Sequence, residues 1–181
     1  MTPPIQGDAN YPNASHTTTL GAIADSYVGD GRSSFTNYGR TTQLLARTGA
    51  AGANRITYLQ FDLSSISTIS SATLRLFGTL SQEGNNSLAV GVFAAAGSFN
   101  ETKITWSNRP AAVGSALAQA NITTAGRRWY QWDLTSYLRQ QKQAGKTTVT
   151  LILEGLTMST SAAFFDSREA EANGPQLVID S

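Results

Sequence analysis

The stretch RITYLQFDLSSISTISSATLRLF, Arg55–Phe77, carries the clearest structural pattern of the chain. Apolar and polar residues alternate in each half, and a Ser/Thr-rich connection without Gly or Pro separates the halves. In the first half, the residues that point to one common side are Thr57, Leu59, Phe61 and Leu63. An alternation of period two with β-branched and aromatic residues is typical of strands that pack on one face. The stretch therefore predicts two strands of an antiparallel sandwich.

The same pattern recurs along the chain and predicts the remaining elements. Residues 1–19 hold three prolines and no periodicity, so we expect a flexible leader or linker there. Further strands are expected within 20–28, 43–46, 88–93, 127–134, 147–153, 162–166 and 176–179. One short helix is expected from Thr135 to Gln143, because Thr135 can cap it and Gly145 would end it. With about eight or nine strands, the prediction is an all-β fold, a jelly-roll β-sandwich of two antiparallel sheets with one short helix, formed by residues 20–181 as one domain.

Composition limits the class of protein. A chain of 181 residues is long enough for one domain that removes roughly 70% of its extended surface from water. There is no cysteine, so disulfides and thiolate metal sites are excluded. Charged residues are only 14% of the chain, as in many secreted β-proteins. No apolar run approaches the roughly 20 residues of a membrane helix. We expect a secreted or cell-surface monomer without membrane contact.

The basic residues are ten arginines and three lysines. Four arginines fall in one short segment that contains Asp30 as its opposing charge, namely Arg32, Arg40, Arg47 and Arg55. A guanidinium offers a planar fork that matches carboxylates, sulfates and phosphates. Together with Tyr38, an aromatic residue in a polar loop, these arginines are the candidate ligand-binding residues for an acidic sugar. The alternative is scattered solubilising charge. The net charge of only +1 argues against the strongly basic face that nucleic-acid binding requires.

Catalytic arrangements find little support. His16 is the only histidine and lies in the expected leader, which argues against a Ser-His-Asp triad and a histidine metal site. A glycosidase needs two carboxylates on one cleft, but Asp62 and Asp133 have the context of turn and cap residues. A lyase would use Tyr38 as acid or base and Arg40 to neutralise a uronate. We assign no catalytic residue.

Seven short motifs, taken in chain order, resemble one known family. They are Ala24–Val28, Asn37–Gly39, Tyr58–Ser64, Ser71–Leu76, Ile104–Trp106 before Pro110, Asp133–Tyr137, and Ser167–Glu169 with Pro175–Ile179. Together they resemble the DNRLRE-type domain, also classed as carbohydrate-binding modules of family ninety-six, over residues 20–181. The sequence departs from this pattern at Phe99, where the resemblance leads us to expect tryptophan ahead of Glu101; Phe fills a similar apolar slot.

The resemblance implies a β-sandwich attached to secreted polysaccharide-degrading enzymes or to surface proteins. Some members bind uronic-acid polymers such as alginate, and they often carry a structural calcium. We therefore expect a non-catalytic carbohydrate-binding module that anchors a catalytic domain of the parent chain on an acidic polysaccharide, alginate first. Two alternatives stay open: a structural or adhesive cell-surface β-sandwich domain without sugar binding, and a polysaccharide lyase.

Acidic residues near the ends of the expected sandwich are candidate calcium ligands, namely Asp25, Asp30, Asp166 and Glu169. The terminal strands of a jelly roll commonly lie side by side, which would let these carboxylates converge. Calcium takes about six to eight oxygen ligands. The alternative is that Asp25 caps a turn and Glu169 pairs with an arginine. On a strand, Arg168 and Glu169 would point to opposite sides and could not pair, so we expect a buried Arg168 to bridge loop carboxylates.

Overall fold

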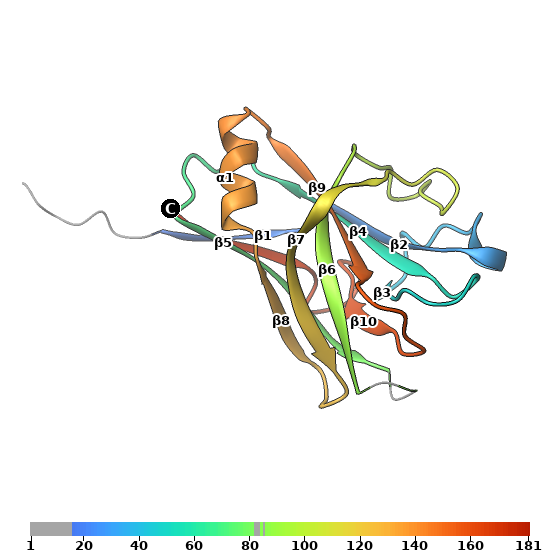
Figure 1. Cartoon of the computed structure of the whole chain (residues 1–181). Helices are drawn as coiled ribbons and strands as arrows, with labels where there is room; N and C mark the ends of the chain where they lie inside the picture. Colours follow the sequence, from blue (N-terminus) through green and yellow to red (C-terminus); the bar gives the residue numbers. More distant parts are fainter. Residues whose placement is uncertain (1–15, 82–83, 85) are drawn as a thin grey trace, which may run out of the picture.

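The computed structural model describes residues 16–81, 84 and 86–181, and in these residues two antiparallel sheets lie face to face (Figure 1). The first sheet contains β1 (Thr17–Gly21), β11 (Gln176–Asp180), β5 (Ser71–Leu80), β10 (Ala163–Asp166), β3 (Gln43–Ala46) and β8 (Arg128–Asp133). The second contains β2 (Ala24–Gly29), β4 (Arg55–Asp62), β9 (Thr148–Gly155), β6 (Ser87–Ala95) and β7 (Ala112–Thr123). The predicted all-β sandwich is confirmed.

The two strands of the Arg55–Phe77 stretch exist as β4 and β5, but they belong to opposite sheets. The Ser/Thr-rich connection therefore crosses from one layer to the other. The inward side chains of both strands meet in one core, where Leu59, Phe61, Leu74 and Leu76 are fully buried. This burial is the main reason for the alternation in the sequence, because each strand turns one face to the shared core.

Strand β4 is also buried on its other face. Tyr58, on the side opposite Leu59, is 1% exposed and packs in a second cluster with Val28, Ile104 and Ile152. Its hydroxyl donates a hydrogen bond to the Pro110 carbonyl at 2.9 Å. The segment 96–111 thus covers the outer face of the second sheet and is held in place by a buried aromatic anchor.

Three parts of the chain differ from the expected elements, and one of them is β7, which forms where no strand was expected. The strand expected within 20–28 is divided into β1 and β2, which belong to different sheets. Residues 17–19 of the expected leader are part of β1, whereas 1–15 lie outside the described residues. Strand β1 pairs antiparallel with β11, so the first and last strands lie side by side, as expected for this architecture.

Helix α1 spans Thr135–Gln143, the predicted range, and its Leu138 is buried against the core. The cap differs from the prediction, because Asp133 Oδ1 accepts the Thr135 backbone N–H at 2.9 Å. Gly145 follows with a φ of 72°, a left-handed conformation that glycine adopts at low cost. A short 3₁₀ turn, η1, covers Gly31–Ser33. Within the described ranges, no helix has the length and apolarity to cross a membrane.

Candidate functional site

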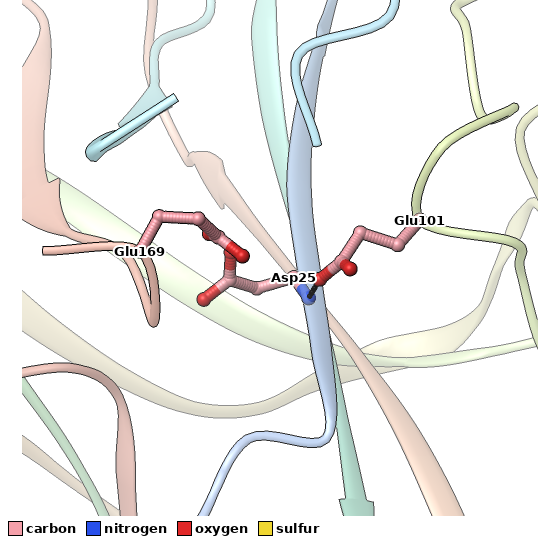
Figure 2. Close-up of side chains that lie close together, drawn as sticks. All are labelled: Asp25, Glu101 and Glu169. Carbon is pink, nitrogen blue, oxygen red and sulfur yellow. Dashed lines mark hydrogen bonds between the residues drawn. The ribbon is translucent and has the colours of Figure 1, made fainter. Parts of the chain in front are cut away.

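Three carboxylates from distant parts of the chain converge at one place (Figure 2). Asp25 lies on β2, Glu101 in the loop between β6 and β7, and Glu169 in the loop between β10 and β11. One ligand oxygen from each of them lies within 4.8 Å of the others. Asp25 is 1% exposed, and Glu101 and Glu169 are partly exposed. We call these three residues the carboxylate cluster.

The protonation of Asp25 reflects this crowding. Burial, with a further contribution from the nearby carboxylates of Glu169 and Glu101, raises the pKa of Asp25 from 3.8 to about 7. One contact acts in the opposite direction, because the Arg168 backbone N–H donates a hydrogen bond to Asp25 Oδ2 at 2.7 Å. A buried carboxylate beside two others is costly as an anion unless a cation compensates it.

Arg168 supplies part of that compensation. Its Nη1 donates to both Glu101 oxygens, at 3.1 and 3.2 Å, and its Nε lies 3.6 Å from Glu169 Oε1. Arg168 thus bridges two loop carboxylates, as expected, although its side chain is 38% exposed and therefore not buried. The expectation that Arg168 and Glu169 could not pair is wrong, because both follow β10 in a turn and the strand alternation does not apply there.

The position of Glu101 is fixed by close backbone packing. Asn37 donates its side-chain N–H groups to the carbonyls of Glu101 and Ile104, both at 2.8 Å. Gly39 is buried against the Glu101 backbone, and a Cβ on this glycine would lie 2.1 Å from the Glu101 carbonyl oxygen. The Glu101 carboxylate in turn accepts the Asp25 backbone N–H at 2.8 Å. The cluster therefore ties the segment 37–39, β2 and the loop around Glu101 together.

The chemistry of the cluster fits a hard cation. All three side chains offer carboxylate oxygens, the ligands that calcium prefers. Glu169 Oε2 is shielded from solvent and has no hydrogen-bond partner in the described structure. A buried acceptor without a partner costs free energy, and a metal ion would satisfy it.

Two of the sequence-predicted metal ligands lie outside the cluster. Asp30 accepts hydrogen bonds from the backbone N–H groups of Gly52 and Asn54, at 2.9 and 2.8 Å, and from the Asn54 side chain at 2.6 Å. Burial alone would raise the pKa of Asp30, but these bonds outweigh it and hold the pKa below its usual 3.8. Asp166 forms an ion pair with Arg127. The structure therefore brings together Asp25 and Glu169 but not Asp30 and Asp166.

Two of the predicted ligand-binding arginines line one hollow. Arg47 and Arg55 pair through their backbones, each N–H lying 2.8 Å from the other's carbonyl oxygen. Their side chains contribute to a surface hollow of about 320 Å³ whose wall also contains Leu45 and Phe164. Arg55 lies 3.7 Å from Asp30, and Arg47 Nε donates to the Ser159 carbonyl at 3.0 Å. These contacts hold two cations beside an apolar wall.

The other three predicted ligand-binding residues do not line this hollow. Arg32 and Arg40 are exposed on the segment between β2 and β3. Tyr38 is half-buried and stacks on Tyr27, with ring centroids 4.1 Å apart and an interplanar angle of 15°. One face of the Tyr38 ring is thus covered by another ring.

Glu101 was absent from the sequence-predicted site. It lies 76 positions from Asp25 in a loop without periodicity, so no local pattern indicates that the two meet. The available signal was the anchored segment 99–110, in which large apolar residues flank a lone glutamate.

Comparison with known proteins gives two findings. The profile of Carbohydrate-binding module family 96 matches residues 16–181. A gellan lyase from Bacillus sp is 28% identical over 136 residues, which cover 73% of this chain and 6% of that protein. The match thus spans only a small part of the length of this relative.

Proposed function

This chain belongs to carbohydrate-binding module family 96, and from this membership we propose that it binds an acidic polysaccharide and anchors an attached enzyme on it. Membership makes it a non-catalytic carbohydrate-binding module. Beyond this membership, we propose that the carbohydrate is acidic and that the module anchors an enzyme on it. Alginate is the first candidate, and gellan is the second because of the similarity to a gellan lyase.

The observation that carries the proposal is the hollow between Arg47 and Arg55. Arg47 and Arg55 line the hollow together with Leu45 and Phe164, so cationic residues and an apolar wall, the two kinds of contact that a uronic-acid residue needs, occur at one place. Guanidinium binds a carboxylate with paired, charge-assisted hydrogen bonds, and the apolar wall packs against the carbon face of the sugar ring. Arg32 and Arg40, exposed on the neighbouring loop, would extend the cationic surface along a longer chain.

The anchor role implies a partner and a location. An anchoring module holds its catalytic domain near an insoluble or gel-forming substrate, which raises the local substrate concentration. A polymer of this kind is met outside the cell, so we place the protein among secreted or cell-surface proteins.

Isothermal titration against alginate, gellan and neutral dextran tests the proposal. Wild-type protein is expected to bind at least one of the acidic polymers and not dextran. Binding should weaken as salt rises from about 0.05 to 0.5 M, because exposed ion pairs are screened over about 10 Å at 0.1 M.

The variant Arg47→Ala should weaken binding about tenfold. The control is Arg139→Ala, which removes the same charge on α1, a helix that contributes no residue to the hollow and lies apart from β3 and β10 (Figure 1). Wild-type protein that binds neither acidic polymer would refute the proposal and favour a structural or adhesive domain. Equal losses of affinity in Arg47→Ala and Arg139→Ala would show that binding depends on the net charge of the protein and not on the hollow.

We further propose that the carboxylate cluster holds a structural calcium. Asp25, Glu101 and Glu169 would be its side-chain ligands, and its charge would compensate the buried Asp25 anion. Support comes from the unpartnered Glu169 Oε2 and from the three converging carboxylates. A cation bound only by the folded state stabilises that state by mass action.

Thermal unfolding with excess calcium and with a chelator tests the calcium site. Calcium should raise the melting temperature of wild-type protein, and Glu169→Gln should abolish the rise. Glu171→Gln is the control, because this glutamate is exposed two positions along the same loop and lies outside the cluster. An unchanged melting temperature, with no metal found by elemental analysis, would contradict the site.

A further inference from the structure

The outer face of the six-stranded sheet carries an ordered set of aromatic and cationic side chains. Alternation along β5 sends Leu74 and Leu76 into the core and leaves Arg75 and Phe77 on the outside. On the neighbouring strand β8, the residue opposite Phe77 is Trp129. Arg75, Phe77 and Trp129 are each half-buried, so part of each side chain packs on its neighbours and part is exposed on the surface.

Contacts between rings and guanidinium groups hold this set in place. The Arg75 Cζ lies 4.7 Å from the centre of the Trp129 ring. The Phe77 ring meets the Trp129 ring edge to face, with centroids 5.5 Å apart and an interplanar angle of 62°. The Arg127 Cζ lies 5.4 Å from the centre of the Phe77 ring, and Arg127 also pairs with Asp166. Cations over aromatic faces and edge-to-face rings are mutually stabilising arrangements.

Arg75 has an unused hydrogen-bond donor. Its Nε is shielded from solvent and has no hydrogen-bond partner among the described residues. Three carboxylates on the strands of this face are engaged by neighbours: Asp133 accepts from Thr135, Asp166 pairs with Arg127, and Asp180 accepts from Thr17 and Ser71. A buried donor without an acceptor costs free energy. None of the ion pairs among the described residues includes Arg75, so the charge of its guanidinium is available to an anionic ligand.

The surface continues into the hollow between Arg47 and Arg55. Strand pairing places Leu45 of β3 opposite Phe164 of β10, and Phe164 opposite Thr79 of β5. Leu45 and Phe164 are part of the wall of the hollow. Phe77 lies two positions from Thr79 on the same side of β5, so the strip from β3 to β8 is unbroken. It crosses three inter-strand spacings, roughly 14 Å.

We propose that this strip, from Arg47 across Phe164 and Phe77 to Trp129 and Arg75, is the surface on which the acidic polysaccharide lies. The inference rests on the proposed function and names its binding surface. The aromatic side chains offer apolar ring surface to successive sugar rings, and the arginines at both ends bind their carboxylates.

Charge argues against a second copy of the chain as the occupant. A two-fold contact places the same face of both copies together. A contact over the whole strip would set Arg47 and Arg75 of one copy against the same cationic surface of the other, and like charges across an interface are costly. A polyanionic sugar chain has the complementary charge.

Titration of alginate and gellan into matched variants tests the inference. Trp129→Ala, Arg75→Met and Arg127→Ala should each weaken binding of the acidic polymer at least about tenfold. Arg128→Ala is the control for Arg127→Ala, because it removes the same charge one position along the chain. The Arg128 side chain contacts Tyr130 and Thr123 and not the rings of the strip. The affinity of this control variant for the acidic polymer should stay within about twofold of that of wild-type protein. Melting temperatures near wild type establish that the variants are folded.

The outcomes separate the inference from the proposed function. If wild-type protein binds an acidic polymer and the Trp129, Arg75 and Arg127 variants bind equally well, the strip is not the binding surface and the proposed function stands. An equal loss in Arg128→Ala would also overturn the inference, because net charge would then explain the effect. If wild-type protein binds neither polymer, both fail. A concentration-dependent dimer that Trp129→Ala abolishes would overturn it in favour of self-association.

Discussion

Replacing Gly39 by alanine should destabilise the protein by about 3 kcal/mol. The added Cβ would lie 2.1 Å from the Glu101 carbonyl oxygen and 2.8 Å from its carbonyl carbon, whereas real Cβ contacts are essentially never closer than 3.0 Å. The Glu101 backbone would have to retreat by close to 1 Å. Overpacking of this kind costs about 1–3 kcal/mol. Movement of Glu101 also weakens its bonds with Asp25 and Arg168, each worth about 1–2 kcal/mol.

Urea unfolding, monitored by circular dichroism, measures this cost. Gly97→Ala is the matched control, because a Cβ on Gly97 would meet nothing within 4 Å. For a domain of this size, 3 kcal/mol corresponds to a fall of about 10 °C in melting temperature. The reasoning is refuted if Gly39→Ala and Gly97→Ala unfold within about 0.5 kcal/mol of each other.

Two further perturbations test the core and the Asp30 hydrogen bonds. Trp132 is 1% exposed, and its indole N–H donates to the Val90 carbonyl at 3.0 Å. Trp132→Ala should therefore lower the free energy of unfolding in urea by about 3–5 kcal/mol, and Trp129→Ala should lower it much less. Similar losses of stability in the two variants would contradict the assignment of Trp132 to the inner and Trp129 to the outer face of β8. Asp30→Asn should cost about 2 kcal/mol at pH 7. Because the pKa of folded Asp30 lies below its usual 3.8, the ionised group stabilises the fold above about pH 4, and this contribution is lost as pH falls through the folded pKa. The difference between wild type and Asp30→Asn should therefore disappear in acid, and a difference independent of pH would contradict this origin.

The alternation in β4 and β5 is visible in the sequence because each strand has one face in the core. The sequence pattern does not say whether two such strands share a sheet, and here they lie in opposite sheets. The range of helix α1 was predicted to the residue, although Asp133 and not Thr135 supplies the capping oxygen, and Gly145 lies just beyond its end. In these cases, a local physical requirement leaves a local sequence signal.

The strands that the sequence did not reveal are edge strands. β1 has the sequence TTTLG and β7 has AVGSALAQANIT, and each lies at the end of its sheet. Most β7 residues before Ala118 are exposed, so burial imposes little pattern on them. Backbone hydrogen bonds to β11 and β6 hold these strands, and such bonds do not depend on the side chain.

The candidate site shows the same limit for carboxylates. Asp25 and Asp30 are five positions apart, but Asp25 lies inside β2 and Asp30 just beyond its end. From that position, Asp30 accepts hydrogen bonds from the backbone N–H groups of Gly52 and Asn54 and is not part of the cluster with Glu169. The residue type predicted an oxygen ligand, whereas the partner of each carboxylate depends on which loops the two sheets bring together.

The carboxylate cluster and the aromatic strip depend on different parts of the sandwich. The cluster joins β2 of the second sheet to loops around Glu101 and Glu169, whereas the strip consists of outward side chains of the first sheet. Side chains on a sheet face are positioned by strand pairing, and the pairing of β5 with β8 involves none of the three clustered carboxylates. A cation bound at the cluster would therefore act on β2 and on the loops around Glu101 and Glu169. The geometry of the strip is determined by the pairing of β3, β10, β5 and β8, and the strip meets the cluster at β10, which the Glu169 loop directly follows.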